Sequence, residues 1–272
     1  MLEQGCAVDA HIPMKPLVYI TGASSGIGQA LALRYHQAGY RLALVARREA
    51  LMREWAQAQG IAAEDFAVYE ADLSVMNEAV AAGQRCIAQQ GLPDVVIANA
   101  GHSIGVDTAY PEDLAAMEQT YALNVLGVAA TFSPFILPMR KRGRGALVGI
   151  ASVAGIRGLP GHGAYCSSKA AVISYCESLR GELRGSGVRV STIAPGYIDT
   201  PLTQGNPYPM PFLMQPEVFA DKTFRQIASG TSYAVIPWQM AVVAKLLRVL
   251  PDWLFDAVLA GRTRKPRGNG RP

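Results

Sequence analysis

Short apolar runs alternate with longer helical patterns along most of this 272-residue chain. Most of these runs lack the polar alternation of a half-exposed strand, which is typical of strands covered by helices on both faces. Strands and helices in strict rotation build a parallel sheet through right-handed crossovers. The sequence therefore predicts an α/β protein with a doubly wound parallel sheet. The predicted strands are 17–22, 41–47, 65–73, 94–101, 145–152 and 188–196, and the predicted helices are 26–39, 48–59, 74–90, 112–138 and 164–185.

The pattern predicts a single domain over residues 14–261, preceded by a loose extension, 1–13, and followed by a basic, flexible tail, 262–272. Subtracting the tail's five positive charges from the formal net charge of +4 leaves −1, so the body offers no broad basic surface for a nucleic acid. The N-terminus lacks the pattern of a signal peptide, and the four cysteines and four histidines lack metal-ligand spacing. We expect a cytoplasmic, metal-free protein.

The segment TGASSGIG, residues 21–28, follows the first predicted strand and opens the first predicted helix. Gly22 permits a tight turn, Gly26 lets the backbone approach a ligand, and Gly28 lets the helix pack on the sheet. Free N–H groups at the start of a helix suit a pyrophosphate. A glycine-rich turn alone is more often only a turn, but at this place in an α/β chain it predicts a dinucleotide site.

Arg47 and Arg48 end the second predicted strand, where an acidic residue would hold the ribose 2′-hydroxyl of NAD. Two guanidinium groups at this point suit a 2′-phosphate instead, which favours NADP. The alternative is a solvated start of the next helix. Basic residues oppose the dipole at a helix N-terminus, so a nearby anion accounts for them better.

Tyr165 and Lys169 lie four apart in a predicted helix and therefore share one face. A nearby cation lowers the pKa of a tyrosine, which can then exchange a proton with a carbonyl or alcohol oxygen. The pair alone fits a packed tyrosine and a snorkelling lysine better, because this spacing is common by chance. Ser152 ends a predicted strand beside them, and Asn124 interrupts the predicted helix 112–138, where its amide can hold a water or bend the helix.

Taken together, TGASSGIG, NAG (99–101), Asn124, Ser152, YCSSK (165–169) and PGYIDT (195–200) resemble the motifs of the short-chain dehydrogenases/reductases. The resemblance spans about residues 15–200 and implies a Rossmann-type sheet of about seven strands. It also implies hydride transfer between a nicotinamide and a carbonyl carbon. Tyr165 would be the general acid/base, Lys169 would lower its pKa and bind the nicotinamide ribose, Ser152 would steady the substrate oxygen, and Asn124 would hold a water.

The same resemblance assigns the cofactor contacts. Asp72 would meet the adenine, Asn99 would lie along the cofactor, and residues 195–200 would face the nicotinamide. The full set of expected NADP contacts is Gly22, Ser24, Ser25, Gly26, Ile27, Gly28, Arg47, Arg48, Asp72, Leu73, Asn99, Ala100, Gly101, Tyr165, Lys169, Pro195, Gly196, Ile198 and Thr200.

Residues 201–236 are rich in proline, methionine and aromatic side chains, and we interpret them as a lid over a hydrophobic substrate. The alternative is that they pack on the body or on a neighbouring subunit. Tyr208 and Phe212 are the expected substrate contacts from this segment, together with Ser152. His102 and His162 flank the expected pocket, where each either touches substrate or is incidental.

The run 237–261 is strongly apolar and is followed directly by the basic tail. We interpret it first as core or an oligomer interface, and second as a peripheral membrane contact through 237–271. The family resemblance implies a homodimer or homotetramer paired through the helices 112–138 and 164–185.

The leading functional hypothesis is an NADPH-dependent carbonyl reductase or alcohol dehydrogenase with a hydrophobic ketone, aldehyde or secondary alcohol as substrate. A dinucleotide-dependent isomerase or epimerase is an alternative, against which the apolar lid and the lack of a long sugar-nucleotide domain count. A catalytically silent dinucleotide-binding protein is the third, and a complete set of Asn124, Ser152, Tyr165 and Lys169 counts against it.

Overall fold

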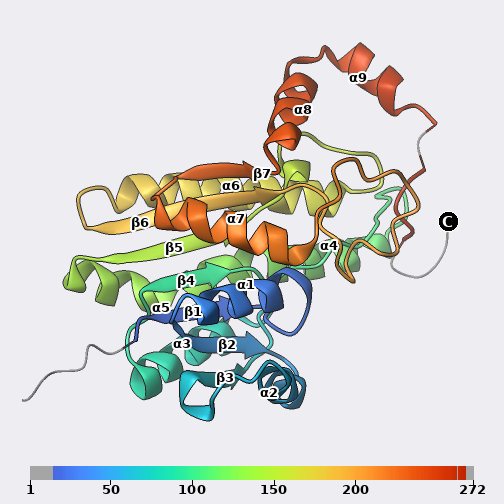
Figure 1. Cartoon of the computed structure of the whole chain (residues 1–272). Coiled ribbons are helices and arrows are strands. Elements are labelled where there is room, and N and C mark those ends of the chain that lie inside the picture. The colour runs from blue at the N-terminus through green and yellow to red at the C-terminus, as the bar shows by residue number, and fades with distance from the viewer. Residues whose placement is uncertain (1–14, 262, 268–272) are drawn as a thin grey trace, which may run out of the picture.

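A computed structural model describes residues 15–261 and 263–267 (Figure 1). Within these residues the strands form one sheet in the order β3-β2-β1-β4-β5-β6-β7, with every neighbouring pair parallel. This confirms the predicted fold class. The strands are β1 Leu17–Thr21, β2 Arg41–Ala46, β3 Phe66–Glu70, β4 Val95–Ala98, β5 Gly145–Ile150, β6 Val188–Pro195 and β7 Tyr233–Ile236.

Helices cover both faces of the sheet (Figure 1). The first face is covered by α1 (Gly26–Gln37), α2 (Glu49–Ala58) and α7 (Pro216–Ala228), whose side chains share one core with the strands. The opposite face is covered by α3 (Met76–Gln90), α5 (Gly127–Arg142) and α6 (Gly163–Glu182). Because both faces are covered, all five residues of β1 are buried. The remaining elements are the helices α4 Asp113–Tyr121, α8 Trp238–Val249 and α9 Asp252–Leu259 and the short turns η1 Ala63–Asp65, η2 Ala122–Leu126 and η3 Val153–Gly155.

The strand order reverses between β1 and β4. The chain after β1 leads to β2 on one side, whereas β4 pairs on the other, as Tyr19 shows by lying between Ala43 and Val96. Connections leave in opposite directions at such a switch point, so a crevice opens beyond the carboxyl ends of the two strands. The fold therefore places the glycine turn after β1 and the segment after β4 on the same crevice.

The single helix predicted over 112–138 has a π-helical turn in its middle. α4 passes into η2, which holds Asn124, and η2 passes into α5. The run Asp113–Arg142 is long and apolar enough to cross a membrane by length and composition. Here it packs on the sheet instead, with Phe132 and Phe135 fully buried in the core. The bend expected at Asn124 is thus a widened helical turn.

The predicted lid, 201–236, has two regular elements that the sequence interpretation missed. Only 201–215 runs as an irregular segment, because α7 begins at Pro216 and β7 follows it. Phe219 and Ala220 of α7 are fully buried, and Asp221 pairs with Arg34 of α1 at 3.0 Å. Proline is favoured in the first turn of a helix, so Pro216 starts α7 rather than extending the loop.

The C-terminal region crosses the edge of the sheet and returns to the body. α8 and α9 extend beyond β7 (Figure 1). Residues 263–267, which we name the C-terminal strap, then come back to the start of α4, where Arg267 is 8% exposed. This part of the predicted flexible tail is therefore held in place. Residues 1–14, Arg262 and 268–272 lie outside the described residues.

Candidate active site

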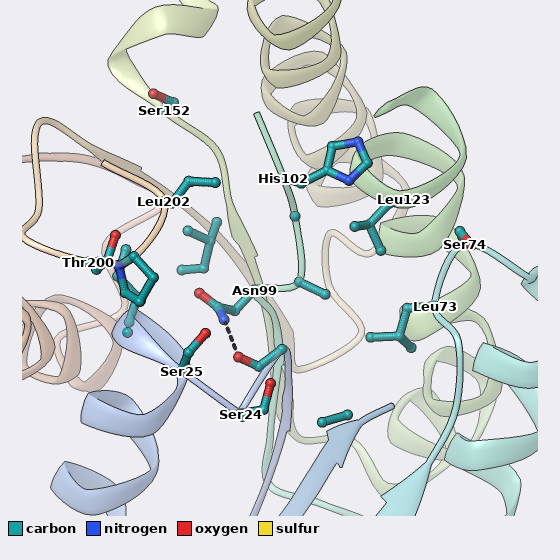
Figure 2. Close-up of a pocket in the computed structure, with 18 of the residues that line it drawn as sticks. Ser24, Ser25, Leu73, Ser74, Asn99, His102, Leu123, Ser152, Thr200 and Leu202 are labelled. Carbon is teal, nitrogen blue, oxygen red and sulfur yellow. Dashed lines mark hydrogen bonds between the residues drawn. The ribbon is translucent and has the colours of Figure 1, made fainter. Parts of the chain in front are cut away.

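A cavity of about 780 Å³, here called the crevice cavity, lies at the carboxyl ends of the strands (Figure 2). The glycine turn, the end of β2 and the segments after β3, β4, β5 and β6 all line it. Every residue predicted to bind the cofactor lines this cavity except Gly28. The sequence interpretation missed several further lining residues, which are Ala46, Ala71, Ser74, Glu118, Gln119, Ala122, Leu123, Ile150, Ala151, Pro201, Leu202 and Thr203.

The glycine turn has the features that a pyrophosphate requires. Ser25 occupies the N-cap of α1 without a side-chain cap, and the first turn of this helix holds no acidic residue. The N–H groups at its start therefore face the cavity without a carboxylate competing for them. A Cβ on Gly22 would lie 2.8 Å from Ala100 Cα, and one on Gly28 would lie 2.1 Å from the Gly22 oxygen. Gly28 thus packs behind the turn, whereas Gly22 and Gly26 shape the cavity wall.

Arg47 and Arg48 line the same cavity with their side chains exposed. Within the described residues neither guanidinium has a hydrogen bond or an ion pair. Asp72 lies nearby, where hydrogen bonds from Ser74 lower the pKa of its carboxyl group and the charge of Arg47 lowers it further. Two uncommitted guanidinium groups and a polar loop therefore border one end of the crevice cavity.

Asn99 ties the end of β4 to the glycine turn. Its amide nitrogen donates to the carbonyl oxygens of Thr21 at 3.0 Å and Gly22 at 3.3 Å (Figure 2). The Thr21 hydroxyl accepts from the backbone N–H groups of Asn99 and Ala100 at 3.0 and 3.1 Å. These four bonds fix the floor of the crevice between the two central strands.

Tyr165 and Lys169 lie on α6, with Ser152 opposite them just after β5. The Lys169 side chain is buried, and its ammonium donates to the carbonyl oxygen of Ile150 at 2.9 Å and lies 5.9 Å from the Tyr165 ring centroid. The Ser152 hydroxyl accepts from the backbone N–H of Ala154 at 3.1 Å. These three side chains all line the crevice cavity.

Burial sets the proton affinities of this pair. It lowers the pKa of Lys169 to about 8 and raises the pKa of Tyr165, although the adjoining Ser152 hydroxyl opposes that rise. Burial outweighs the groups that lower the pKa of the tyrosine in this arrangement, and the role of Lys169 stays a prediction. Burial disfavours both charged forms, the phenolate and the ammonium. The i, i+4 spacing in the sequence does not reveal how deeply the two side chains are buried.

Asn124 is fully buried and does not line the crevice cavity. Its side chain forms two hydrogen bonds with the backbone of His102, accepting from the N–H and donating to the carbonyl oxygen, each at 3.0 Å. It also donates to the Ser168 hydroxyl at 3.0 Å. A Cβ on Gly101 would lie 3.1 Å from Asn124 Oδ1 and 3.2 Å from Lys169 Nζ. Asn124 thus acts as a positioning residue that holds the 101–103 backbone beside Lys169.

A second cavity of about 790 Å³, here called the apolar cavity, adjoins the first. The residues shared by both linings are Ser152, Tyr165, Gly196, Leu202 and Thr203. Apolar side chains of the irregular 201–215 segment, α8 and α9 form a large part of its remaining wall, among them Pro209, Met240, Val243, Leu247 and Leu259. A reacting group at Ser152 and Tyr165 can therefore be reached from both cavities.

The predicted substrate contacts separate in the structure. His162 and Tyr208 line the apolar cavity and pack edge to face, with ring centroids 5.7 Å apart. His102 lines the crevice cavity instead, where its Nε2 lies 3.1 Å from the Thr120 hydroxyl. Phe212 lines neither cavity and is half exposed, so the structure places it apart from the other predicted substrate contacts.

The sequence matches the short chain dehydrogenase family over residues 16–208. The chain belongs to the short-chain dehydrogenase/reductase family. An uncharacterised oxidoreductase of Myxococcus xanthus is 40% identical over 242 residues, which cover 88% of this chain and 94% of that protein. Members of this family are oxidoreductases that typically use a nicotinamide dinucleotide.

Two solved structures, the first a short-chain dehydrogenase/reductase, share the fold. One from Burkholderia phymatum in complex with NAD has a TM-score of 0.77 and 23% identity, covering 93% of this chain and 97% of that one. ElxO with NADP bound has a TM-score of 0.73 and 22% identity, covering 82% and 97%. Since the two hold different dinucleotides, the fold alone does not select between NAD and NADP for this family member.

The short-chain dehydrogenase/reductase motifs lead to the crevice cavity, but they contribute only Ser152, Tyr165, Gly196 and Tyr197 to the described lining of the apolar cavity. They give no information on α8, α9 and the C-terminal strap, which supply the outer wall through Val258, Thr263 and Lys265 among others. The signal that could have identified this wall is the apolar run 237–261. This run is longer than is needed to cover the edge of the sheet at β7. The sequence interpretation assigned that run first to the core or an oligomer interface, and second to a peripheral membrane contact.

Proposed function

We propose that this protein is an NADPH-dependent carbonyl reductase that acts on hydrophobic ketones or aldehydes. The observation that carries the proposal is the junction of two unlike cavities at Ser152 and Tyr165. One has the glycine turn and uncommitted guanidinium groups of a dinucleotide site, and the other is mostly apolar. When bound, the reduced nicotinamide supplies a hydride to the carbonyl carbon.

The residues at the junction of the two cavities can donate a proton and a hydrogen bond to the carbonyl oxygen of the substrate. Burial keeps the pKa of Tyr165 above its ordinary value, so the phenol holds its proton at neutral pH and can donate it as the carbonyl is reduced. The Ser152 hydroxyl, which adjoins the phenol, can donate a second hydrogen bond to the same oxygen. The Lys169 ammonium lies close enough to offset the charge that develops on the phenolate.

The preference for NADPH is supported by Arg47 and Arg48. A 2′-phosphate beside the end of β2 would pair with guanidinium groups that have no other partner among the described residues, whereas the ribose 2′-hydroxyl of NAD has no acidic residue at that point. Because NADPH is the usual cellular reductant, this preference favours carbonyl reduction as the physiological direction.

The proposal extends to assembly and location. Leu114, Leu126 and Leu137 are exposed along α4, η2 and α5, which supports pairing of subunits as a homodimer or homotetramer through these helices. Trp238, Leu246 and Trp253 expose a second apolar surface on α8 and α9, which an oligomer would bury.

A peripheral membrane contact is the second interpretation of this apolar surface. Flotation with anionic vesicles at low and high salt tests it. We place the protein in the cytoplasm.

The test is a screen for NADPH oxidation. Purified protein is mixed with NADPH and a panel of ketones and aldehydes of graded size and polarity, and the loss of NADPH absorbance is followed. The proposal expects turnover that rises with the apolar surface of the substrate. Tight binding of NADPH without its oxidation by any member of the panel would contradict it.

A further inference from the structure

The apolar cavity contains a cation without a partner. Lys265 lines its wall, and the described residues give the ammonium of this lysine no hydrogen bond or ion pair. Arg157, the other cation of the lining, is fully engaged. It donates to the Leu250 carbonyl at 2.7 Å and to Asp252 at 2.8 Å, and it lies 3.8 Å over the Phe255 ring. No aspartate or glutamate lines this cavity among the described residues.

The C-terminal strap fixes Lys265 at this wall. Its anchor is Arg267, which bonds the Asp113 carboxylate through two nitrogens at 2.7 and 2.9 Å and lies 3.8 Å over the Tyr110 ring. Arg267 also forms a parallel bridge with Gly105, where a Cβ would lie 2.5 Å from the Lys265 oxygen. The backbone on either side of the lysine is therefore held against the body, and the lysine does not lie on a free tail.

The charge of Lys265 affects the pKa values of two histidines that line the cavities. Burial, and to a smaller extent the charge of Lys265, lower the pKa of His162 to about 4. The same charge contributes to the lowered pKa of His102, after burial and the nearby cations Arg47 and Lys169. Both imidazoles are therefore neutral at pH 7, so neither of them balances the positive charge of Lys265. The cavity thus carries an uncompensated positive charge within mostly apolar walls.

We propose that the apolar cavity selects substrates with an apolar body and a carboxylate, and that Lys265 binds the carboxylate while the carbonyl group faces Ser152 and Tyr165. This inference rests on the proposed function and narrows its substrate class. An unpaired ammonium in apolar surroundings is costly, and a carboxylate offsets that cost, while the walls bury the hydrocarbon. A single ammonium matches a monoanion, whereas a phosphate favours the fork of an arginine, and Arg157 is occupied.

The first experiment compares turnover. Straight-chain oxo acids of graded length and their methyl esters are reduced with NADPH, and kcat/KM is measured for each. The wild type should prefer the acid at the best length by about tenfold or more, which corresponds to 1.4 kcal/mol. Lys265→Met should erase this preference by raising KM for the acid, and Lys265→Arg should restore most of it. Lys245→Met, which removes an exposed cation of α8 outside the cavity lining, should keep the wild-type preference.

The second experiment measures binding without turnover. Saturated carboxylic acids and the alcohols of the same length are titrated into the protein by calorimetry. The wild type should bind the acid more tightly, and Lys265→Met should bind the two equally. If ketones are reduced but acids and esters react and bind alike, the assignment of Lys265 is overturned while the reductase proposal stands. If acids bind through Lys265 but no carbonyl is reduced, the reductase proposal fails and the binding site stands.

Discussion

Arg267 lies with its guanidinium against the carboxylate of Asp113, Nε 2.7 Å from Oδ2, and so joins the end of the described chain to the start of α4. Both side chains are more than nine-tenths buried. The pair raises the pKa of Arg267 and lowers that of Asp113, so both groups keep their charge. A buried pair of this kind is sensitive to the loss of either partner, because the other charge is then left uncompensated.

Arg267→Ala should free the C-terminal strap. We expect faster tryptic cleavage after Arg264, a melting temperature lower by a few degrees, and weaker discrimination between acid and ester substrates. Limited proteolysis followed by mass spectrometry measures the first effect. Arg225→Ala removes an exposed partner of Asp221 and serves as the control. A strap that stays as resistant to trypsin in Arg267→Ala as in the wild type would show that the pair does not hold it.

Tyr165→Phe should remove the proton donor and little else. We expect kcat to fall by a factor of about 10² to 10⁴, the usual contribution of general acid catalysis, while the dissociation constant for NADPH changes by less than about twofold. Steady-state kinetics and NADPH fluorescence titration measure the two quantities. Tyr175→Phe on the same helix should keep wild-type turnover. The assignment of the acid is refuted if Tyr165→Phe retains a large fraction of the activity.

Arg47→Ala combined with Arg48→Ala should change the choice of cofactor. Loss of two charge-assisted contacts to a 2′-phosphate should weaken NADPH by about tenfold to a hundredfold and leave NADH nearly unchanged. Titration with both dinucleotides tests this. Arg53→Ala, which removes a cation of α2 that pairs with Glu49 away from the cavity, should affect neither. Equal losses for NADPH and NADH would contradict the phosphate interpretation.

His162 should make the protein sensitive to acid. Burial and Lys265 hold the pKa of His162 at about 4, whereas the unfolded chain titrates near 6.5, so the unfolded state binds the proton more readily between these values. The contribution of the neutral imidazole is therefore intact above pH 6.5 and is lost as the pH falls to 4, by about 3 kcal/mol at most. Urea unfolding across this range should show a shallower loss for His162→Gln than for the wild type, and parallel curves would contradict the assignment.

The fold could be predicted from the sequence where local pattern and burial agree. The apolar strands have no polar alternation because helices cover both faces, and this periodicity indicated six of the strands. β7 and α7 were missed because the proline-rich stretch before Pro216 was interpreted as one continuous lid. The spacing of Phe219, Ala220, Thr223 and Ile227, all buried in α7, is nevertheless that of an amphipathic helix.

The candidate site could be predicted only where sequence motifs mark strand ends. Gly22, Arg47 and Tyr165 follow or lie beside such ends, and the structure brings them to one cavity. The pKa values of side chains depend on burial, which sequence spacing does not report, and so the effect of burial on the Tyr165 pKa could not be predicted. Lys265 could not be recognised, because only the return of the strap to α4 brings a basic tail into the wall of a cavity.

The two cavities draw on different parts of the chain. Among the described residues, the lining of the crevice cavity ends at Thr203, whereas that of the apolar cavity continues to Lys265. Roughly half of the residues that line the apolar cavity are thus encoded after Thr203, in a stretch of the gene that contributes nothing to the lining of the crevice cavity. Exchange or drift of the last quarter of the coding sequence can therefore give the enzyme a new substrate while its way of binding the dinucleotide is inherited unchanged.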